Sequence, residues 1–240
     1  MIKGPLDSGL YGSVGALVRS IMPEHTVYCE PFFREGEVFF TKHPSRREVL
    51  NDTDQHVINF YTVLRTQWQE LSFLIESTLY SDTLSQLADD MLDGRKGSDA
   101  LYRAWALWLR YNRDRVNRGA WLYNTAHWLA ARTDDVPDGR RLQRVLSDRL
   151  QNVQLTSRPA DEIIRVCDSP DTFFYFRPTD RKSLNALMPL LGSLQGRFAL
   201  YYHDRRLLDQ TGHRLSLVCE TAPDGTAVYT NFKRQKNLFD

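Results

Sequence analysis

The stretch Asp168-Ser169-Pro170-Asp171-Thr172-Phe173-Phe174-Tyr175-Phe176-Arg177-Pro178-Thr179-Asp180 decides the fold of this 240-residue chain. Its first four residues are typical of a turn, and the five that follow, Thr172 to Phe176, are aromatic or β-branched without interruption. Such a run predicts a strand that is buried on both faces of a parallel sheet. The next four residues end the strand in a loop, and doubly wound α/β folds keep their chemistry in loops at this end of the sheet.

Composition and charge limit the classes of protein to consider. The chain is 42% hydrophobic, which is enough for one substantial core with an inserted subdomain. Its formal net charge is only +1, so a signal for nucleic-acid binding must be local. No charged-then-apolar leader is present, and no apolar run approaches the roughly 18–20 residues of a membrane span. We therefore expect a cytoplasmic protein with no membrane partner.

The cysteines are three, Cys29, Cys167 and Cys219, and they lie far apart in the sequence. Each is next to apolar, strand-like sequence. An odd number at these spacings favours reduced, buried thiols over disulfides or a metal site.

The opening stretch resembles a known family. Asp168-Ser169-Pro170-Asp171-Thr172-Phe173-Phe174-Tyr175 is similar to the strand that carries the catalytic Asp-Pro-Pro-Tyr of Dam-type (D12 class) N-6 adenine-specific DNA methyltransferases. The resemblance implies a Rossmann-like sheet whose cofactor is S-adenosylmethionine (SAM). The catalytic tetrapeptide itself is Arg177-Pro178-Thr179-Asp180 here. The approach to the catalytic motif therefore matches the family, and the motif does not.

The loop that contacts SAM in this family matches in part. Glu30-Pro31-Phe32 stands where the family has Glu-Pro-Phe-x-Gly-x-Gly, but of the two glycines only Gly36 is present, and Arg34 replaces the other. The family needs glycines because the backbone passes directly against the cofactor. With Arg34 there and the bulky Phe33 before it, we expect a closed or poorly formed pocket and lost or weak SAM binding. A buried guanidinium needs a carboxylate partner. The nearby acids are Glu30, Glu35 and Asp52.

The end of the predicted second strand carries Asn51-Asp52. By resemblance, Asp52 accepts hydrogen bonds from the ribose hydroxyls of the cofactor, because a carboxylate offers only acceptors. The alternative is that Asp52 or Asp54 caps the helix that the apolar spacing after it predicts. The family also contacts SAM through a lysine near the start of the chain, and no lysine lies between Lys3 and Lys42.

Methylation of the adenine amino group requires a side-chain acceptor facing the flipped base. Arg177 carries only donors and a permanent positive charge, and Asp180 has no ring to stack on the base as the family's tyrosine does. The loop that encloses the base is nearly absent before the helix near Ser183. These losses in an intact scaffold predict a protein that does not transfer methyl groups. In the alternative, Asp168, Asp171 or Asp180 supplies another acceptor.

From Thr66 to about Arg149 the apolar residues recur at helical spacing, which predicts a helical insertion. The resemblance to Dam-type methyltransferases implies that this insertion corresponds to the family's target-recognition subdomain. Between Arg95 and Arg118 lie seven basic and two acidic residues, a local charge of 7 − 2 = +5. Arginine suits phosphate and base-edge contacts, and tryptophan can stack. The candidate DNA-binding residues are Arg110, Arg113, Arg115, Arg118 and Trp121. The alternative is a solvated helix end.

The remaining sequence completes the sheet. Further strands are predicted at 153–156, 197–202, 215–219 and 226–232. The Asp224-Gly225 turn indicates a hairpin, which is similar to the antiparallel pair that closes methyltransferase sheets. We therefore predict an α/β, Rossmann-like SAM-dependent methyltransferase sheet with a mainly helical inserted subdomain. The predicted parts are 1–66 and 150–240 for the methyltransferase-like core and 67–149 for the insertion.

Three hypotheses about function follow. The first is a catalytically inactive Dam-like protein that binds DNA or serves as partner subunit, in a heterodimer, of an active methyltransferase. The second is an active site-specific DNA adenine methyltransferase with rearranged motifs. The third is a module that binds a nucleotide or a protein in the former cofactor pocket.

Overall fold

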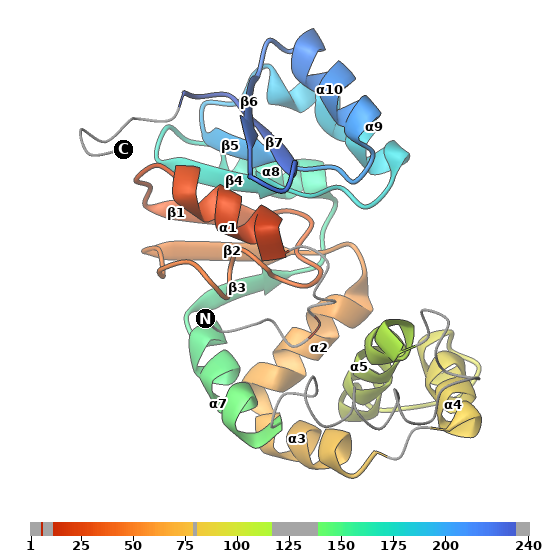
Figure 1. Ribbon diagram of the computed structural model, residues 1–240. Coiled ribbons are helices and arrows are strands. Elements are labelled where there is room, and N and C mark those ends of the chain that lie inside the picture. Colours follow the sequence, from red (N-terminus) through yellow and green to blue (C-terminus); the bar gives the residue numbers. More distant parts are fainter. Residues whose placement is uncertain (1–5, 7–11, 79–80, 117–138, 234–240) are drawn as a thin grey trace. The chain divides into compact units, whose positions relative to one another are not determined.

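The computed structural model describes residues 6, 12–78, 81–116 and 139–233, and these divide into two compact units (Figure 1). The sheet unit comprises the described residues of 9–53 and 152–240. The helical unit comprises Leu6 and the described residues of 54–151. Residues 54–66, predicted from the sequence as part of the core, belong to the helical unit in the structure. The reason is that the helix formed by these residues packs mainly on other helices.

The sheet unit contains one mostly parallel sheet, with the described strands in the order β3-β2-β1-β4-β5-β7-β6. Neighbours from β3 to β5 are parallel, whereas β7 is antiparallel to both β5 and β6. The strands are β1 (Val27–Glu30), β2 (Arg47–Asn51), β3 (Val153–Thr156), β4 (Thr172–Phe176), β5 (Arg197–Leu200), β6 (Val218–Thr221) and β7 (Ala227–Thr230). The α/β class predicted from the sequence is confirmed.

Strand β4 lies in the middle of this sheet, between β1 and β5, and all five of its residues are buried. Phe174 and Phe176 stack on one face, with ring centroids 5.3 Å apart, and belong to the same apolar cluster as Phe198. Because successive strand residues point to opposite faces, Phe173 and Tyr175 serve the other face. The prediction of a strand buried on both faces is therefore confirmed, and its uninterrupted aromatic run has a structural reason.

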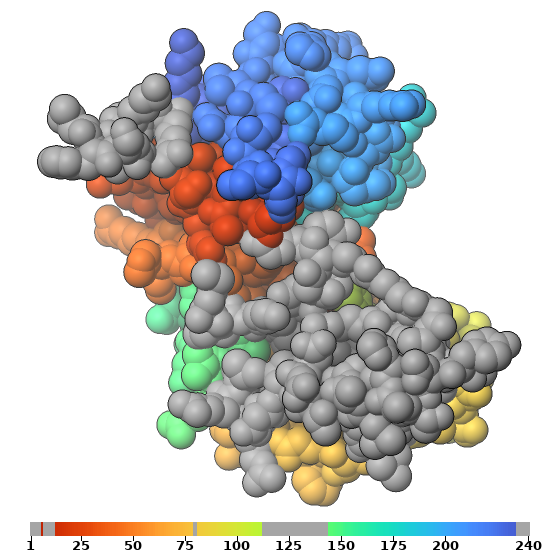
Figure 2. Space-filling view, in the orientation of Figure 1, coloured from red at the N-terminus to blue at the C-terminus, as the bar shows by residue number. Residues whose placement is uncertain are grey.

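Helices cover both faces of the sheet. The cluster that contains Phe174 also contains side chains from α8 (Ala160–Cys167), α9 (Arg181–Leu191) and α10 (Arg205–Arg214). Helix α1 (Gly12–Ile21) packs near β7, where Ser13 Oγ lies 3.1 Å from Thr226 Oγ1. In the space-filling view the red residues of α1 lie beside the blue residues of this last hairpin (Figure 2). The apolar faces of the central strands are thereby removed from water.

The last hairpin differs in detail from the prediction. A strand was expected at 215–219, but β6 begins only at Val218. Leu215 caps the end of α10, and Ser216 has a φ of 53°, which is incompatible with an extended strand. The cysteines also differ from the expectation, because Cys29 is buried, Cys167 is half-buried and Cys219 is exposed.

The described part of the predicted insertion is helical. Its described helices are α2 (Gln55–Thr66), α3 (Trp68–Glu76), α4 (Asp82–Leu92), α5 (Ala100–Val116) and α7 (Gly139–Leu150). Ser81 caps α4 by accepting a hydrogen bond from Leu84 N. Trp105 of α5 donates from Nε1 to Thr78 Oγ1 at 2.7 Å, which fixes α5 to the end of α3. No helix in the described ranges combines the length and the apolar composition needed to span a membrane.

The contact between α10 and β7 predicts a specific sensitivity at Gly212. A Cβ on Gly212 would lie 2.0 Å from Cε1 of Tyr229, whose hydroxyl is tied to Asp209 at 3.0 Å. We expect Gly212→Ala to lower the free energy of unfolding by about 1–3 kcal/mol, because the ring cannot move away freely. Urea denaturation followed by circular dichroism measures this change.

Gly192→Ala is the matched control, because no atom lies within 4 Å of its added Cβ and its φ is −74°. We expect a change within about 0.5 kcal/mol for this variant. Equal losses in the two variants would contradict the packing of α10 on β7.

Candidate functional site

Arg177, the first residue after β4, lies in a buried ion triad. Its Nη1 lies 2.5 Å from Oε2 of Glu35 and 2.5 Å from Oε2 of Glu37. Only 8% of Arg177 is exposed, and both glutamates are buried. Burial alone would lower the pKa of Arg177, but Glu37, Tyr175 and Glu35 raise it further than burial lowers it. The guanidinium therefore stays charged at this end of the sheet.

The two glutamates come from the segment after β1, which a glycine turn holds in place. Gly36 has a φ of 67°, and its N–H donates to the carbonyl of Phe33 at 3.0 Å. A Cβ at position 36 would lie 2.7 Å from the Phe33 ring, so the position needs glycine on both counts. This turn puts Glu35 and Glu37 on either side of Gly36, where both side chains reach Arg177.

Glu37 also joins the triad to the core of the sheet. Its Oε1 accepts a hydrogen bond from the hydroxyl of Tyr175 at 2.6 Å, while Oε2 contacts Arg177. Burial raises the pKa of Glu37, and Arg177 opposes the rise. Because Tyr175 belongs to β4, the strand before Arg177 supplies part of the polar environment of the triad.

A second buried carboxylate lies on the neighbouring strand. Glu30, at the end of β1, accepts hydrogen bonds from the Tyr28 hydroxyl at 2.5 Å and from the N–H of Phe39 at 3.1 Å. Its burial raises its pKa to about 8. This candidate cofactor residue is thus hydrogen-bonded within the protein's own core.

The end of β2 is bound to the loops beside it. Asn51 donates to the carbonyls of Pro31 at 3.1 Å and Arg158 at 3.0 Å. The side chain of Asp52 accepts a hydrogen bond from the backbone N–H of Arg34 at 3.0 Å. The cap of α2 is Asp54, whose side chain accepts from His56 N at 2.9 Å. Of the two roles weighed for Asp52, capping therefore falls to Asp54, and the Asp52 carboxylate holds the loop after β1.

The space between these loops is small. A cavity of about 100 Å³ lies where the loops after β1, β4 and β5 meet, well below the roughly 300–1,000 Å³ of ordinary ligand pockets. Its lining residues are Arg34, Glu35, Arg177, Pro178, Thr179, Tyr201 and His203.

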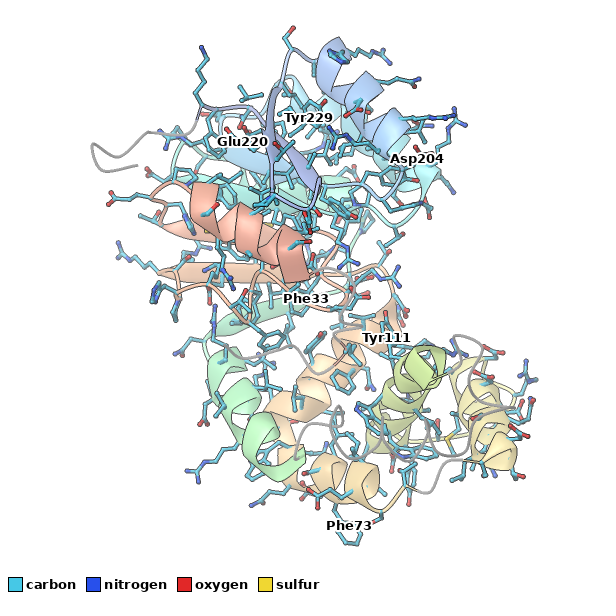
Figure 3. The ribbon with its side chains drawn as sticks, viewed as in Figure 1. Phe33, Phe73, Tyr111, Asp204, Glu220 and Tyr229 are labelled. Atoms are coloured by element: carbon cyan, nitrogen blue, oxygen red, sulfur yellow. The ribbon has the colours of Figure 1, made fainter. Side chains whose placement is uncertain are left out.

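Phe33, labelled in Figure 3, is 1% exposed and packs edge-on against Phe39 with ring centroids 5.7 Å apart. Phe32 is partly buried against the core cluster on the other sheet face.

The structure brings together only some of the residues that sequence analysis singled out. Arg177, Pro178 and Thr179 line the cavity with Arg34, but Asp180 turns away and caps α9, accepting from Ser183 N at 2.7 Å. This backbone hydrogen bond lowers the pKa of Asp180. Arg177 is a buried guanidinium with glutamate partners, a role that the sequence suggested for Arg34. Sequence analysis missed Glu37 and Tyr175, although an arginine directly after a buried strand is itself a signal that acids lie nearby.

The candidate DNA-binding residues are described only in part. Arg110 donates from Nε to Asp89 at 3.0 Å and from Nη2 to Asp93 at 3.2 Å. Arg95 is bound in the same way to Asp90 and Asp93. The acids of α4 therefore offset part of the basic charge counted between Arg95 and Arg118. The side chains of Arg113 and Arg115, and all of Arg118 and Trp121, lie outside the described residues.

Comparison of the chain with protein-family models and with curated proteins found no match in either case. The function proposed below therefore depends on the geometry of this site and on the resemblance of its motifs.

The triad predicts a pH-dependent loss of stability when its cation is removed. We expect Arg177→Met to lower the free energy of unfolding by about 3–5 kcal/mol at pH 8, because two carboxylates then remain buried without their cation. The loss should be smaller at pH 5.5, because burial raises the pKa of Glu37 and the removal of Arg177 raises it further, so that uptake of a proton becomes more favourable as the pH falls. Urea denaturation at both pH values measures the difference.

The control variant is the combination Arg177→Met, Glu35→Gln and Glu37→Gln, which removes the charges together. It should recover most of the stability and show no such pH dependence. A loss that is equal at the two pH values would contradict the ionic role of Arg177.

Glu30 predicts a second pH effect, of defined sign. Its pKa is about 8 in the folded protein against an ordinary value of 4.5, so the folded state holds a proton that the unfolded state releases. This contribution to stability is complete below pH 4.5 and is lost as the pH rises through 8. Glu30→Gln keeps an oxygen acceptor but cannot titrate. We expect it to flatten the fall in stability between pH 5 and 8 by up to about 1.4 kcal/mol per pH unit.

Glu24→Gln, the same substitution at an exposed position, is the matched control. Chemical denaturation at pH 5.5, 6.5 and 7.5 supplies the slopes. Parallel slopes for the wild type and Glu30→Gln would mean that Glu30 does not hold the proton.

Proposed function

We propose that this chain is a catalytically inactive, Dam-like homologue of adenine DNA methyltransferases. In this proposal it binds DNA as the partner subunit of an active methyltransferase. The observation that carries the proposal is the ion triad of Arg177 with Glu35 and Glu37. It lies directly after β4, where the resemblance puts the acceptor that methyl transfer requires.

The topology of the sheet supports the relation to methyltransferases. Five parallel strands are followed by β7 and β6, and β7 is inserted antiparallel between β5 and β6. The antiparallel pair closes the sheet as the resemblance of the sequence implies. The parallel strand β4 then delivers its loop to the carboxyl edge, where open α/β sheets bind their ligands.

The chemistry of the triad argues against methyl transfer by this chain. A guanidinium offers donors only, so Arg177 cannot accept hydrogen bonds from the amino group of adenine. Glu35 and Glu37 have the right type of oxygen, but both contact the Arg177 guanidinium. A fixed positive charge beside the SAM sulfonium would add repulsion. The cavity of about 100 Å³ is also smaller than the roughly 300–1,000 Å³ of pockets that hold ligands of the size of SAM.

The acids that an active enzyme could use instead lie at the other end of the strands or cap a helix. Asp168 accepts hydrogen bonds from the backbone N–H groups of Gln195 and Gly196 at 3.0 and 2.9 Å. Asp171 precedes β4, and its carbonyl accepts from Thr26 and Val27 at the start of β1. Both acids therefore belong to the amino end of the strands, opposite the site. Asp180 caps α9. These contacts disfavour the hypothesis of an active enzyme with rearranged motifs.

Two groups of cations could contact DNA phosphates in the proposed role. The helical-unit cations are Arg113, Arg115 and Arg118, as the sequence suggested. The sheet-edge cations are Arg181, Lys182 and Arg206, all exposed in the first turns of α9 and α10. Asp204, which Figure 3 labels, caps α10 as Asp180 caps α9. Cations in a first helical turn are unfavourable to the helix dipole, so stability does not explain their position.

The first functional prediction concerns catalysis. Incubation of the purified protein with unmethylated duplex DNA and labelled SAM should give only background incorporation, because no acceptor faces the base. Calorimetry should detect no tight SAM binding.

The methylation assay, repeated on an active Dam-type enzyme with and without this chain, tests the partner role. We expect the chain to change the activity or the DNA affinity of that enzyme.

Two results would count against this proposal. Turnover by the lone chain that Asp180→Asn abolishes would support an active enzyme. An active homologue that is unaffected by the chain, together with no DNA binding by either form, would leave only the binding-module hypothesis.

The second functional prediction concerns salt. Alanine replacement of whichever cation group contacts DNA should reduce the slope of log affinity against log salt by about two to three units, since each phosphate contact contributes about 0.9. The two triple variants, measured separately by gel shift from 50 to 200 mM salt, locate the contact. Arg110→Ala is the control with little expected effect, because Arg110 is bound to acids of α4. Unchanged slopes in both triple variants would contradict DNA binding through either group.

A further inference from the structure

Two cysteines far apart in the sequence meet inside the sheet unit. Cys29 is the third residue of β1 and is fully buried, whereas Cys167 is the last residue of α8 and is half-buried. Both belong to the apolar cluster between the sheet and its helices, where Cys167 packs at the edge of the cluster. Helix α8 packs on β1, and each of the two thiols shifts the pKa of the other. Neither is joined in a disulfide.

The surroundings of the two thiols differ in a way that assigns them different roles. The neighbouring Cys29 thiol lowers the pKa of Cys167, burial opposes this shift, and the charge of Arg47 lowers the pKa further. Burial raises the pKa of Cys29. Cys167 is therefore both the more accessible sulfur and the better thiolate, which are the two properties that make a cysteine reactive toward oxidants.

We propose that Cys29 and Cys167 form a reversible disulfide when the protein meets a peroxide. The Cys167 thiolate attacks one oxygen of hydrogen peroxide, and the O–O bond breaks. The attacked oxygen stays on Cys167 as a sulfenic acid, and the other leaves as hydroxide, which takes up a proton to form water. The Cys29 sulfur then attacks the sulfenic sulfur and displaces hydroxide, which leaves as a second water with the Cys29 proton. Two thiols are oxidised, one peroxide is reduced, and a thiol reductant reverses the reaction.

The position of this bond gives it a consequence for the whole fold. Cys29 lies in the segment before the helical unit and Cys167 in the segment after it, so the disulfide closes a loop that contains residues 54–151. A cross-link across so long a loop restricts the unfolded chain strongly. It also ties α8 to β1, which pack together in the reduced protein. Oxidation should therefore stabilise the sheet unit.

The test compares wild type with Cys29→Ser, Cys167→Ser and Cys219→Ser after treatment with hydrogen peroxide. Free thiols are blocked with N-ethylmaleimide, and proteolytic peptides are analysed by mass spectrometry without reduction. We expect a peptide pair joined through Cys29 and Cys167 in the wild type and in Cys219→Ser only. The melting temperature of both proteins should rise by about 5–10 °C and return to its initial value with dithiothreitol.

The exposed Cys219 serves as the internal control for oxidation. Oxidation of Cys219 at peroxide concentrations that leave Cys29 and Cys167 as free thiols would overturn the proposal. A cross-link that joins either of them only to Cys219 would do the same. If Cys29→Ser does not fold, Cys167→Ser, which changes a half-buried residue, still decides the question. The outcome is independent of whether the protein binds DNA or SAM.

Discussion

The charge of Arg177 is the constraint on which the carboxyl edge of the sheet depends. The Arg177 guanidinium, at the end of a strand buried on both faces, is largely removed from water, so it requires acids within contact distance. Glu35 and Glu37 meet that requirement from the segment after β1, the strand next to β4. Adjacent parallel strands release their loops at the same edge, and this places residues some 140 positions apart in one cluster.

The pairing of β1 with β4 also explains the other polar contacts at this edge of the sheet. Tyr28 and Tyr175, on the neighbouring strands β1 and β4, direct their hydroxyls to Glu30 and Glu37, so that both carboxylates are satisfied inside the protein. Phe33 and the turn at Gly36 close the segment over this polar layer. The cavity of about 100 Å³ lined by Arg34, Glu35 and Arg177 lies beside this layer. The raised pKa values of Glu30 and Glu37 reflect that burial.

The pleat of β1 separates this site from the thiol pair. Tyr28 and Glu30 belong to the face of the polar layer, while Cys29 between them belongs to the cluster with α8 and α9. A cross-link at Cys29 would therefore act through the backbone of β1 and leave the side chains of the ion triad in place. The fold thus places the ion triad and the pair of cysteines on opposite faces of the same sheet.

The sequence alone determined what depends on local pattern. The aromatic run before Arg177 predicted the central strand, the Asp224-Gly225 turn predicted the last hairpin, and the lack of an acceptor at Arg177 followed from its chemistry. The partners of Arg177 could not be predicted, because they depend on the direction in which an irregular loop turns its side chains. That direction is set by the positive φ of Gly36 and by the packing of Phe33, which only the tertiary structure decides. Periodicity encodes burial along one element, whereas ion pairs between loops arise from strand order.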